Sequence, residues 1–228
     1  EIFEIADRVT VLRDGEHVGT RNIEELTRDS MIELMVGRSI ENEYPKEAAE
    51  LGEVRLACQN LSRGKKVKDV SFEIRRGEIL GLTGLVGAGR TETARLVFGA
   101  DRPDSGALQL DGQPVVVKNP RDAIEKGICL LTEDRKGQGL IIGQTVRENF
   151  GLPNLRSFGR WGFIDKTRET EALQVRAKQL QVKFTGSEQI IATLSGGNQQ
   201  KIALAKWLER DAEVIIFDEP TRGIDVGA

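Results

Sequence analysis

Long apolar runs are missing from this sequence of 228 residues. No stretch approaches the roughly 20 residues that a membrane-spanning helix needs. The amino end, EIFEIADRV, has neither an initiator Met nor the apolar region of a signal peptide. We therefore expect any role at a membrane to depend on a partner.

An excess of basic residues is also missing, because the formal net charge is −3. Proteins that bind nucleic acids usually carry a basic patch or stripe, so we expect no nucleic-acid partner. One local cluster, formed by Arg63, Lys65, Lys66 and Lys68, has two interpretations, a solvated turn before a strand or a nucleic-acid contact. We favour the turn, since an isolated basic cluster is weak evidence for nucleic-acid binding.

Cysteine and histidine are scarce. Cys58 and Cys129 are far apart in the sequence and form no C-x-x-C pair, which argues against a zinc or dithiol site. Both lie in strand-like runs, so we expect buried free thiols, consistent with a reducing compartment. His17 is the only histidine, and we expect it on the surface of a hairpin.

The first part of the chain predicts a small folded segment followed by a linker. Residues 7–22 read as two alternating runs joined by Asp14-Gly15, a strong hairpin signal. Thr27 or Asp29 can cap a helix that ends at Gly37. Residues 39–53 are rich in Glu, contain a proline and show no apolar period, which indicates a linker.

From Val54 onward, strand-like and helix-like stretches alternate, which is typical of an α/β domain with a largely parallel sheet. We expect strands over residues 54–61, 67–74, 78–84, 107–112, 127–133 and 213–217. We expect helices over residues 91–99, 120–127, 165–182 and 196–210.

A glycine-rich loop joins one expected strand to the next helix. The stretch GLVGAGRT, residues 84–91, fits the phosphate-binding pattern G-x-x-x-x-G-K-[ST] except that Arg90 stands in the lysine position. Backbone amides of such a loop cradle phosphates, and the hydroxyl of Thr91 can bind Mg²⁺. The strand before it and the helix after it are the context that the pattern requires.

An apolar strand ends in two carboxylates. In EVIIFDEP, Asp218 can hold Mg²⁺, and Glu219 can orient or deprotonate an attacking water. On its own the pattern also fits a strand that ends in an exposed acidic turn.

A third motif, LSGGNQQK, opens the last helix. Ser195 can cap this helix, and the amides of Gly196 and Gly197 at its positive end can receive a phosphate. The alternative interpretation is an ordinary helix start with flexible glycines.

Together these motifs resemble those of ATP-binding-cassette (ABC) proteins, with a phosphate loop (Walker A), a signature motif and an acidic strand (Walker B) in the family's order. GLVGAGRTE, EDRKGQGL, LSGGNQQK and DEPTRGIDVGA are most similar to the second nucleotide-binding domain of the double-domain ATPases of ribose- and galactose-type sugar importers. The resemblance implies an α/β P-loop NTPase of the ABC type, with a mainly parallel core sheet, an antiparallel β subdomain and a helical subdomain at about 140–190. It also implies that residues 1–38 are the end of a preceding nucleotide-binding domain, 39–53 a linker, and 54–228 a second domain truncated after its D-loop.

The resemblance assigns roles to individual residues. Glu219 is the expected catalytic residue, Thr91 and Asp218 are the expected Mg²⁺ ligands, Glu133 occupies the Q-loop position and Asp225 lies in the D-loop. The expected phosphate-binding residues are Gly84, Leu85, Val86, Gly87, Ala88, Gly89, Arg90 and Thr91. The expected signature residues, which contact the ATP of a partner domain, are Leu194, Ser195, Gly196, Gly197 and Asn198.

Several residues depart from the family pattern, all on the phosphate-loop side. Arginine is longer and planar where lysine is a compact, rotatable charge, so Arg90 can grip phosphate with a poorer transition-state fit. Glu92 replaces a hydroxyl near the α-phosphate, Glu133 replaces a glutamine, and no aromatic residue before the loop is available to stack on adenine. We therefore expect an asymmetric protein, in which this domain's signature is sound and its own phosphate loop hydrolyses ATP slowly or not at all.

The resemblance further implies ATP and Mg²⁺ as cofactors and a peripheral location on the cytoplasmic face of the inner membrane. The implied partners are the preceding nucleotide-binding domain, transmembrane permease subunits and, indirectly, a periplasmic solute-binding protein. Phe150, Phe158, Trp161 and Phe163 either line the surface that docks on the permease or form the core of the helical subdomain. Two other functions stay open: a regulatory nucleotide-binding half with little hydrolysis, and a cytosolic ABC ATPase without transport.

Overall fold

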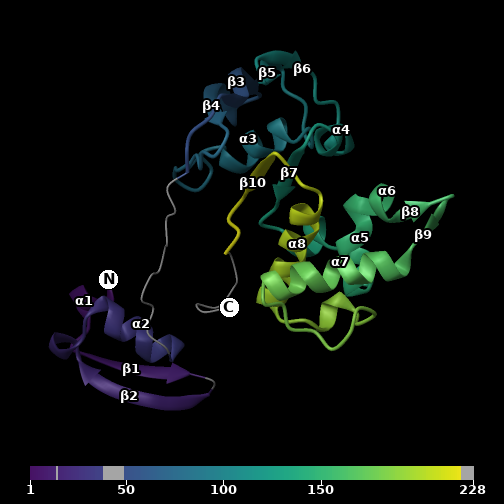
Figure 1. The fold of residues 1–228 in the computed structure, drawn as a ribbon. Coiled ribbons are helices and arrows are strands. Elements are labelled where there is room, and N and C mark those ends of the chain that lie inside the picture. Colours follow the sequence, from purple (N-terminus) through teal and green to yellow (C-terminus); the bar gives the residue numbers. More distant parts are fainter. Residues whose placement is uncertain (14, 38–48, 222–228) are drawn as a thin grey trace. The chain divides into compact units, whose positions relative to one another are not determined.

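The computed structural model describes residues 1–13, 15–37 and 49–221 (Figure 1). The chain divides between residues 48 and 49 into two compact units. Asp225, the expected D-loop residue, and most of the expected linker lie outside the described residues.

The first unit contains the predicted hairpin and helix. Strands β1 (Arg8–Arg13) and β2 (Glu16–Asn22) pair antiparallel, after a short α1 (Ile2–Ile5) and before a 3-10 turn, η1 (Ile23–Glu25). Helix α2 (Arg28–Val36) is capped by Thr27, whose hydroxyl accepts a hydrogen bond from the Ser30 amide at 3.1 Å, and not by Asp29. Gly37 ends the helix in the left-handed region, where glycine is favoured.

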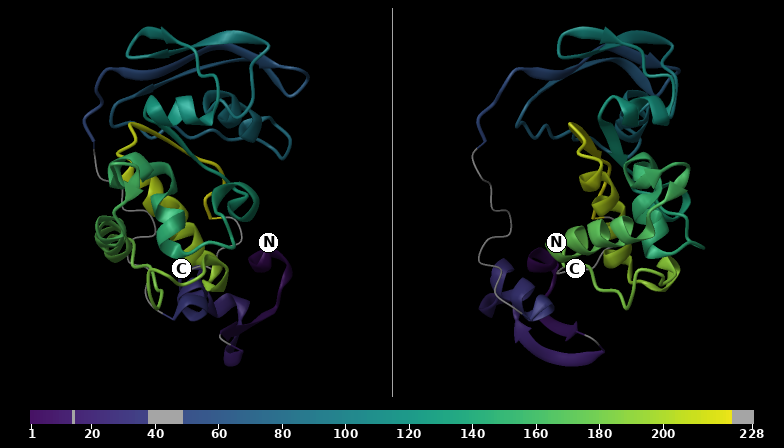
Figure 2. Two further views of the ribbon diagram at one scale, coloured as in Figure 1. Left: turned by 90° about the vertical axis from the view of Figure 1, so that its right-hand side faces the viewer. Right: turned by 45° about the vertical axis from the view of Figure 1, so that its right-hand side comes forward.

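The second unit begins with an antiparallel sheet in the order β4-β3-β5-β6. Its strands are β3 (Val54–Arg63), β4 (Val67–Arg75), β5 (Ser105–Leu110) and β6 (Gln113–Val115). Apolar side chains of β3 and β5 pack with those of α3 (Arg90–Val97) and α4 (Pro120–Glu125), which lie beneath the sheet in Figure 2. Cys58 is a buried free thiol in this core, as predicted.

A parallel pair connects this sheet to the rest of the unit. Strands β7 (Ile128–Leu131) and β10 (Val214–Phe217) run side by side, and both were predicted. The predicted strand over residues 78–84 is wrong, because the described residues offer this segment no ladder partner and its backbone is irregular. Apolar residues there stay in solvent; the side chain of Ile79 is 94% exposed.

Helices form the remainder of the unit and enclose a second core. The main ones are α5 (Val146–Gly151), α6 (Leu155–Phe158), α7 (Lys166–Gln179) and α8 (Gly196–Glu209), and α8 contacts both α5 and α7. Shorter elements connect them: a π turn η2 (Arg135–Gly139), 3-10 turns η3 (Leu152–Asn154) and η4 (Ile191–Thr193), and strands β8 (Gly159–Arg160) and β9 (Phe163–Ile164). Cys129 is a second buried free thiol, also as predicted.

The four aromatic residues considered for a docking surface separate into two groups. Phe150 and Phe158 are buried at 0% and 4% exposure, with ring centroids 6.1 Å apart, so of the two predicted roles they have the one in the core. Trp161 and Phe163 are 88% and 80% exposed on the β8–β9 hairpin.

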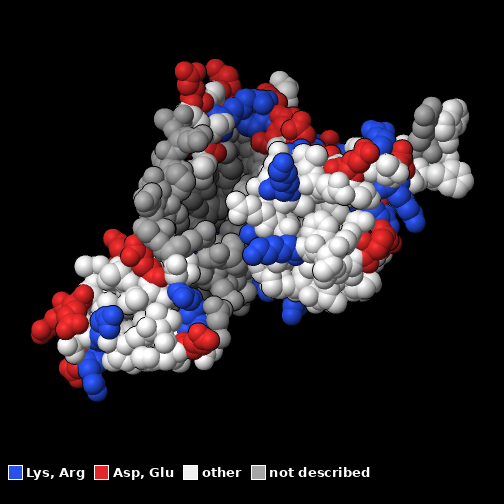
Figure 3. Space-filling view, turned by 60° about the horizontal axis from the view of Figure 1, so that its bottom comes forward, with Lys and Arg blue, Asp and Glu red and all other residues white. Residues whose placement is uncertain are grey.

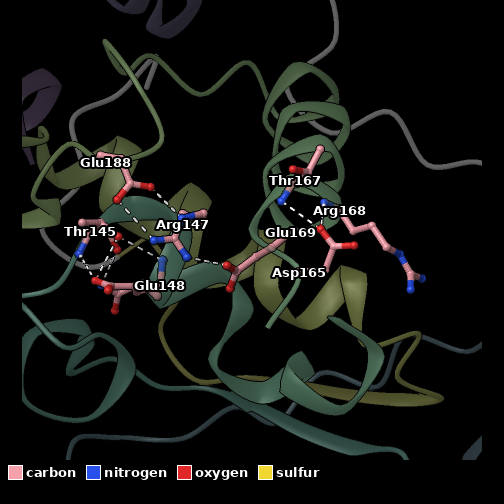
Figure 4. Close-up of polar contacts among 9 residues, drawn as sticks. Thr145, Arg147, Glu148, Asp165, Thr167, Arg168, Glu169 and Glu188 are labelled. Carbon is pink, nitrogen blue, oxygen red and sulfur yellow. Dashed lines mark hydrogen bonds and ion pairs between the residues drawn. The ribbon is translucent and has the colours of Figure 1, made fainter. Parts of the chain in front are cut away.

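A buried ion network joins α5 to α7 (Figure 4). The guanidinium of Arg147 lies 2.5 Å from the carboxylate of Glu169, and these side chains are 5% and 1% exposed. Arg147 also contacts the exposed Glu188 at 2.6 Å, and its backbone amide donates to the Ser187 carbonyl. Ser187 and Glu188, which precede the signature motif, are therefore held at the amino end of α5 by a hydrogen bond and an ion pair.

Candidate nucleotide site

The glycine loop leaves the amino end of α3 available to an anion. Gly89 precedes α3 with φ +88°, and no side chain caps the helix. A Cβ atom at Gly89 would lie 2.4 Å from the carbonyl oxygen of Lys66, so only glycine fits there. The first amides of a helix and its dipole attract negative charge, which makes this end of α3 a candidate phosphate site.

The acidic strand and the Q-loop position meet at one edge of the parallel pair. The amide of Asp218 donates to the Leu131 carbonyl at 2.9 Å, so the residues that follow β10 lie beside those that follow β7. Burial, and then the neighbouring charges of Glu133 and Glu219, raise the pKa of Asp218. The hydroxyl of Thr91 hydrogen-bonds to the Asp218 carboxylate and opposes that shift.

This set of oxygen atoms fits Mg²⁺. Thr91, Glu133 and Asp218 present hydroxyl and carboxylate oxygens, and a cation would relieve the crowding of negative charge that raises the pKa of Asp218. Within the described ranges, no group of three or more acidic, thiol or imidazole side chains is arranged to hold a metal by itself. Mg²⁺ usually binds through one or two carboxylates plus substrate phosphates, and this arrangement suits that mode.

Arg90 lies against the expected catalytic carboxylate. Its guanidinium nitrogen is 3.3 Å from a carboxylate oxygen of Glu219, and the two side chains are 33% and 43% exposed. Glu219 has φ +41°, an uncommon conformation for a residue with a side chain, which can mark a functional position. Sequence reasoning identified both residues but not their contact.

Lys66 is a residue that sequence reasoning did not place at this site. Its ammonium lies 2.6 Å from the carboxylate of Glu92 and lowers the pKa of that group. A carboxylate near the α-phosphate would repel it, and the ammonium of Lys66 partly offsets the charge of Glu92. The signal in the sequence was the basic cluster, which does form the β3–β4 turn, with Arg63 paired to Asp101 at 2.6 Å.

A cavity of about 400 Å³ opens beside Arg90, at the start of α3. Arg90, Asp218 and Glu219 line one part of it, and apolar residues of β4, α3 and β10 line much of the rest. Its other charged lining residues are Arg55, Arg75, Arg76, Glu78 and Glu213. None of residues 194–198, the described signature, lines this cavity. The structure thus brings Arg90, Thr91 and Glu133 together with Asp218 and Glu219, whereas residues 84–89 and the signature do not line the cavity.

The signature motif forms a well-ordered helix start. Ser195 caps α8, with its hydroxyl accepting from the Asn198 amide at 3.4 Å. The Asn198 side chain donates to the same hydroxyl at 2.9 Å and accepts from the Lys183 amide at 2.8 Å, so it fixes the turn. Leu194 is buried in the helical core, while Gly196 and Gly197 are half-buried.

The described chain contains no helix that is long and apolar enough to cross a membrane. His17 is exposed and hydrogen-bonds to Thr20 at 3.1 Å, which agrees with the prediction of a surface residue.

Comparison with known proteins supports the same family. The ABC transporter family model matches residues 67–222. Ribose import ATP-binding protein RbsA 3 of Rubrobacter xylanophilus is 54% identical over 228 residues, which is 100% of this chain and 46% of that protein. Ribose import ATP-binding protein RbsA of Bacillus subtilis is 46% identical, with the same two coverages. The chain thus spans less than half the length of these curated relatives.

Solved structures show the same fold. A dimeric post-hydrolysis structure of the ATP-binding cassette MJ0796, bound to ADP and Pi, superposes with a TM-score of 0.62 at 22% identity, covering 75% of this chain and 76% of that one. A nucleotide-free ATP-binding cassette from an ABC transporter gives 0.63 at 18% identity, covering 75% and 71%. The predicted fold class is confirmed, and the chain belongs to the ABC transporter family of ATP-binding proteins.

Proposed function

We propose that this chain is the second ATP-binding domain, with the end of the first, of an ATPase that drives import of ribose or a related small solute. The proposal of nucleotide binding rests on one observation. Asp218, which follows β10, interacts with Thr91 in the first turn of α3 and with Glu133. The transport part rests on the relatives, which are named as ribose import ATP-binding proteins.

In this proposal residues 1–38 end the preceding nucleotide-binding domain, residues 39–53 form the linker, and residues 54–228 form the second domain, with a helical part at about 140–190. The partners are the preceding domain, permease subunits and, indirectly, a solute-binding protein, on the cytoplasmic face of the inner membrane. Ser195, Gly196 and Gly197 would contact ATP held by the preceding domain, which agrees with their separation from the cavity at Arg90.

Each residue of the site has a role in this proposal. Amides of residues 84–91 and the guanidinium of Arg90 bind phosphate oxygens, and Glu219 orients the attacking water. Mg²⁺ held by Thr91 and Asp218, with Glu133 beside them, would supply positive charge that neutralises the phosphates. Asp225 would contact the partner domain from the D-loop.

The contact between Arg90 and Glu219 supports slow hydrolysis at this site. The 3.3 Å ion pair engages the carboxylate that must orient water and the guanidinium that must bind phosphate. Phosphate binding would have to compete with Glu219 for Arg90. Lysine is shorter and offers a point charge in place of a planar fork, so Arg90→Lys should loosen this pairing and raise turnover.

The test is steady-state ATP hydrolysis by the full-length protein assembled with its permease. If Glu219→Gln leaves activity intact, this site is a binding platform and the first domain performs the chemistry. A collapse of activity in Glu219→Gln, or no change in Arg90→Lys with full activity at this site, would contradict slow hydrolysis here.

Two other functions lead to different outcomes. A regulatory half would bind nucleotide and change the activity of the first domain without any turnover of its own. A cytosolic ABC ATPase would copurify with ribosomes or DNA, whereas a transporter subunit would copurify with a membrane permease from a detergent extract.

A further inference from the structure

The β8–β9 hairpin holds a tryptophan in an unfavourable conformation. Its two-residue turn consists of Trp161 and Gly162, with φ of +55° and +82°. Glycine suits both positions of such a turn, but a bulky side chain is strained there. Strain at an exposed aromatic residue is an observation that points to function.

The hairpin is also the centre of an exposed apolar patch, which we call the hairpin patch. Its side chains and their exposures are Leu152 at 43%, Leu155 at 39%, Trp161 at 88%, Phe163 at 80% and Ile164 at 45%. The hairpin projects beyond α5, α6 and α7 in Figure 1. Large exposed apolar patches on soluble units mark sites of protein or membrane interaction.

Exposed basic residues lie next to this patch in the sequence. Arg156 lies in α6, before the hairpin, and Lys166 and Arg168 lie in the first turn of α7, directly after it. Arg156 has a partner, Glu125, at 3.1 Å. In Figure 3 the projection at the right has uncharged atoms at its tip and both basic and acidic side chains at its base.

The acidic residues closest to the hairpin in the sequence form hydrogen bonds or ion pairs within the fold. The carboxylate of Asp165 caps α7 by accepting from the amides of Thr167 and Arg168, both at 3.1 Å (Figure 4). Glu169 is 1% exposed and is paired with Arg147. The hairpin patch therefore exposes aromatic side chains, and exposed basic residues flank it in the sequence.

We propose that the hairpin patch docks directly on a lipid bilayer with anionic headgroups. Trp side chains favour the membrane–water interface, where the ring is partly desolvated and its N–H stays wet. Basic residues beside an apolar anchor add attraction to anionic lipids. This lipid contact adds to any contact made through a partner, and it depends on no nucleotide chemistry.

The experiment uses vesicles of phosphatidylcholine alone and vesicles with about a third phosphatidylserine, which makes the surface anionic. Flotation measures binding, and tryptophan emission reports the hairpin, because the other tryptophan, Trp207, is 7% exposed. We expect binding and a blue shift with the anionic vesicles, weakened at least about tenfold by raising the salt concentration from about 0.05 M to 0.5 M.

Three variants locate the contact. The double variant Trp161→Ala, Phe163→Ala should lose at least about tenfold in vesicle partitioning, because apolar burial and charge must act together in such an anchor. Val175→Ala, which shortens another apolar side chain that is 57% exposed, should bind like the wild type. Lys166→Glu with Arg168→Glu should lose the preference for phosphatidylserine, while acidic residues in the first turn of α7 still suit the helix dipole.

The outcomes separate clearly. An unshifted emission of the wild-type chain with anionic vesicles would overturn the proposal, whether or not the variants fold. Undiminished binding of the double variant, or equal binding to both kinds of vesicle, would do the same. Protection of Trp161 only by a protein partner would assign the hairpin patch to that partner instead. ATP hydrolysis by the double variant, measured in parallel, keeps this test separate from that of the proposed function.

Discussion

The prediction that the structure quantifies best concerns the buried ammonium of Lys206. Its side chain is 6% exposed, donates a hydrogen bond to the carbonyl of Gly139, and has its ammonium 4.9 Å from the centre of the Trp207 ring. No carboxylate within the described residues pairs with it. Burial lowers the pKa of Lys206 from its ordinary 10.5 to about 8.

Because the pKa of Lys206 is lower in the folded chain, the free energy of unfolding depends on pH. Between pH 8 and 10.5 the unfolded chain keeps a proton on Lys206 that the folded chain has lost, so stability rises with pH. Below about pH 8 the lysine is charged in both states and the full penalty of burying the charge is present. The pKa difference corresponds to about 3 kcal/mol, at 1.36 kcal/mol for each pH unit.

The perturbation is Lys206→Met, which keeps an unbranched side chain one heavy atom shorter and removes its charge. Met also loses the hydrogen bond to the Gly139 carbonyl, a cost of roughly 1–3 kcal/mol that does not depend on pH. We expect the free energy of unfolding of the variant, minus that of the wild type, to fall by about 3 kcal/mol between pH 8 and 10.5.

Urea titrations at several pH values, followed by tryptophan fluorescence, measure this difference; Trp207 is buried and Trp161 exposed in the folded chain, so unfolding changes the surroundings of Trp207 most. Burial raises the pKa of the nearby Cys129 thiol to about 12, so that thiol stays neutral across the window. Lys201→Met, on the same helix but half-buried, controls for the general effect of methionine in α8. A difference between Lys206→Met and wild type that stays constant with pH would refute the reasoning.

Two further predictions follow from other parts of the fold. Gly89→Ala should weaken nucleotide binding at least about tenfold, measured by calorimetry, because the loop cannot keep its conformation; Gly112→Ala, also at positive φ but with open space around it, is the control. Arg147→Ala should destabilise the chain by about 3–5 kcal/mol in urea titrations, because it leaves Glu169 buried and unpaired. Glu188→Gln, at an exposed partner of the same guanidinium, should cost less than about 1 kcal/mol.

Local signals in the sequence predicted most of the elements. The β1–β2 hairpin, the caps at Thr27 and Ser195, and the helical period of residues 165–182 and 196–210 all depend on neighbours along the chain. The prediction of a strand over residues 78–84 was wrong because it depends on residues that are distant in the sequence. Its apolar composition fits a buried parallel strand, but pairing depends on a distant strand that composition cannot reveal.

The candidate site shows the same limit. Asp218 and Glu219 were predictable, because they follow an apolar strand. The approach of Lys66 to Glu92 was not, since the β3–β4 turn reaches α3 only through the packing of the sheet on that helix. The separation of the aromatic residues into core and surface also depends on tertiary packing and is not visible in their spacing.

The departures from the family pattern at the phosphate loop are not independent of one another. Arg90 lies against Glu219, Glu92 against Lys66, and Glu133 beside Asp218. Each replaced residue thus has a charged neighbour, and restoring the family residue at one position changes what that neighbour faces: Arg90→Lys keeps a positive charge near Glu219, whereas Glu133→Gln removes a negative charge beside Asp218. Contacting residues usually couple by about 0.5–3 kcal/mol, so single reversions need not add up to an ordinary phosphate loop. The effect of Arg90→Lys on turnover therefore depends on what Glu219 does once the guanidinium is gone, and the reversion tests the pair and not the arginine alone.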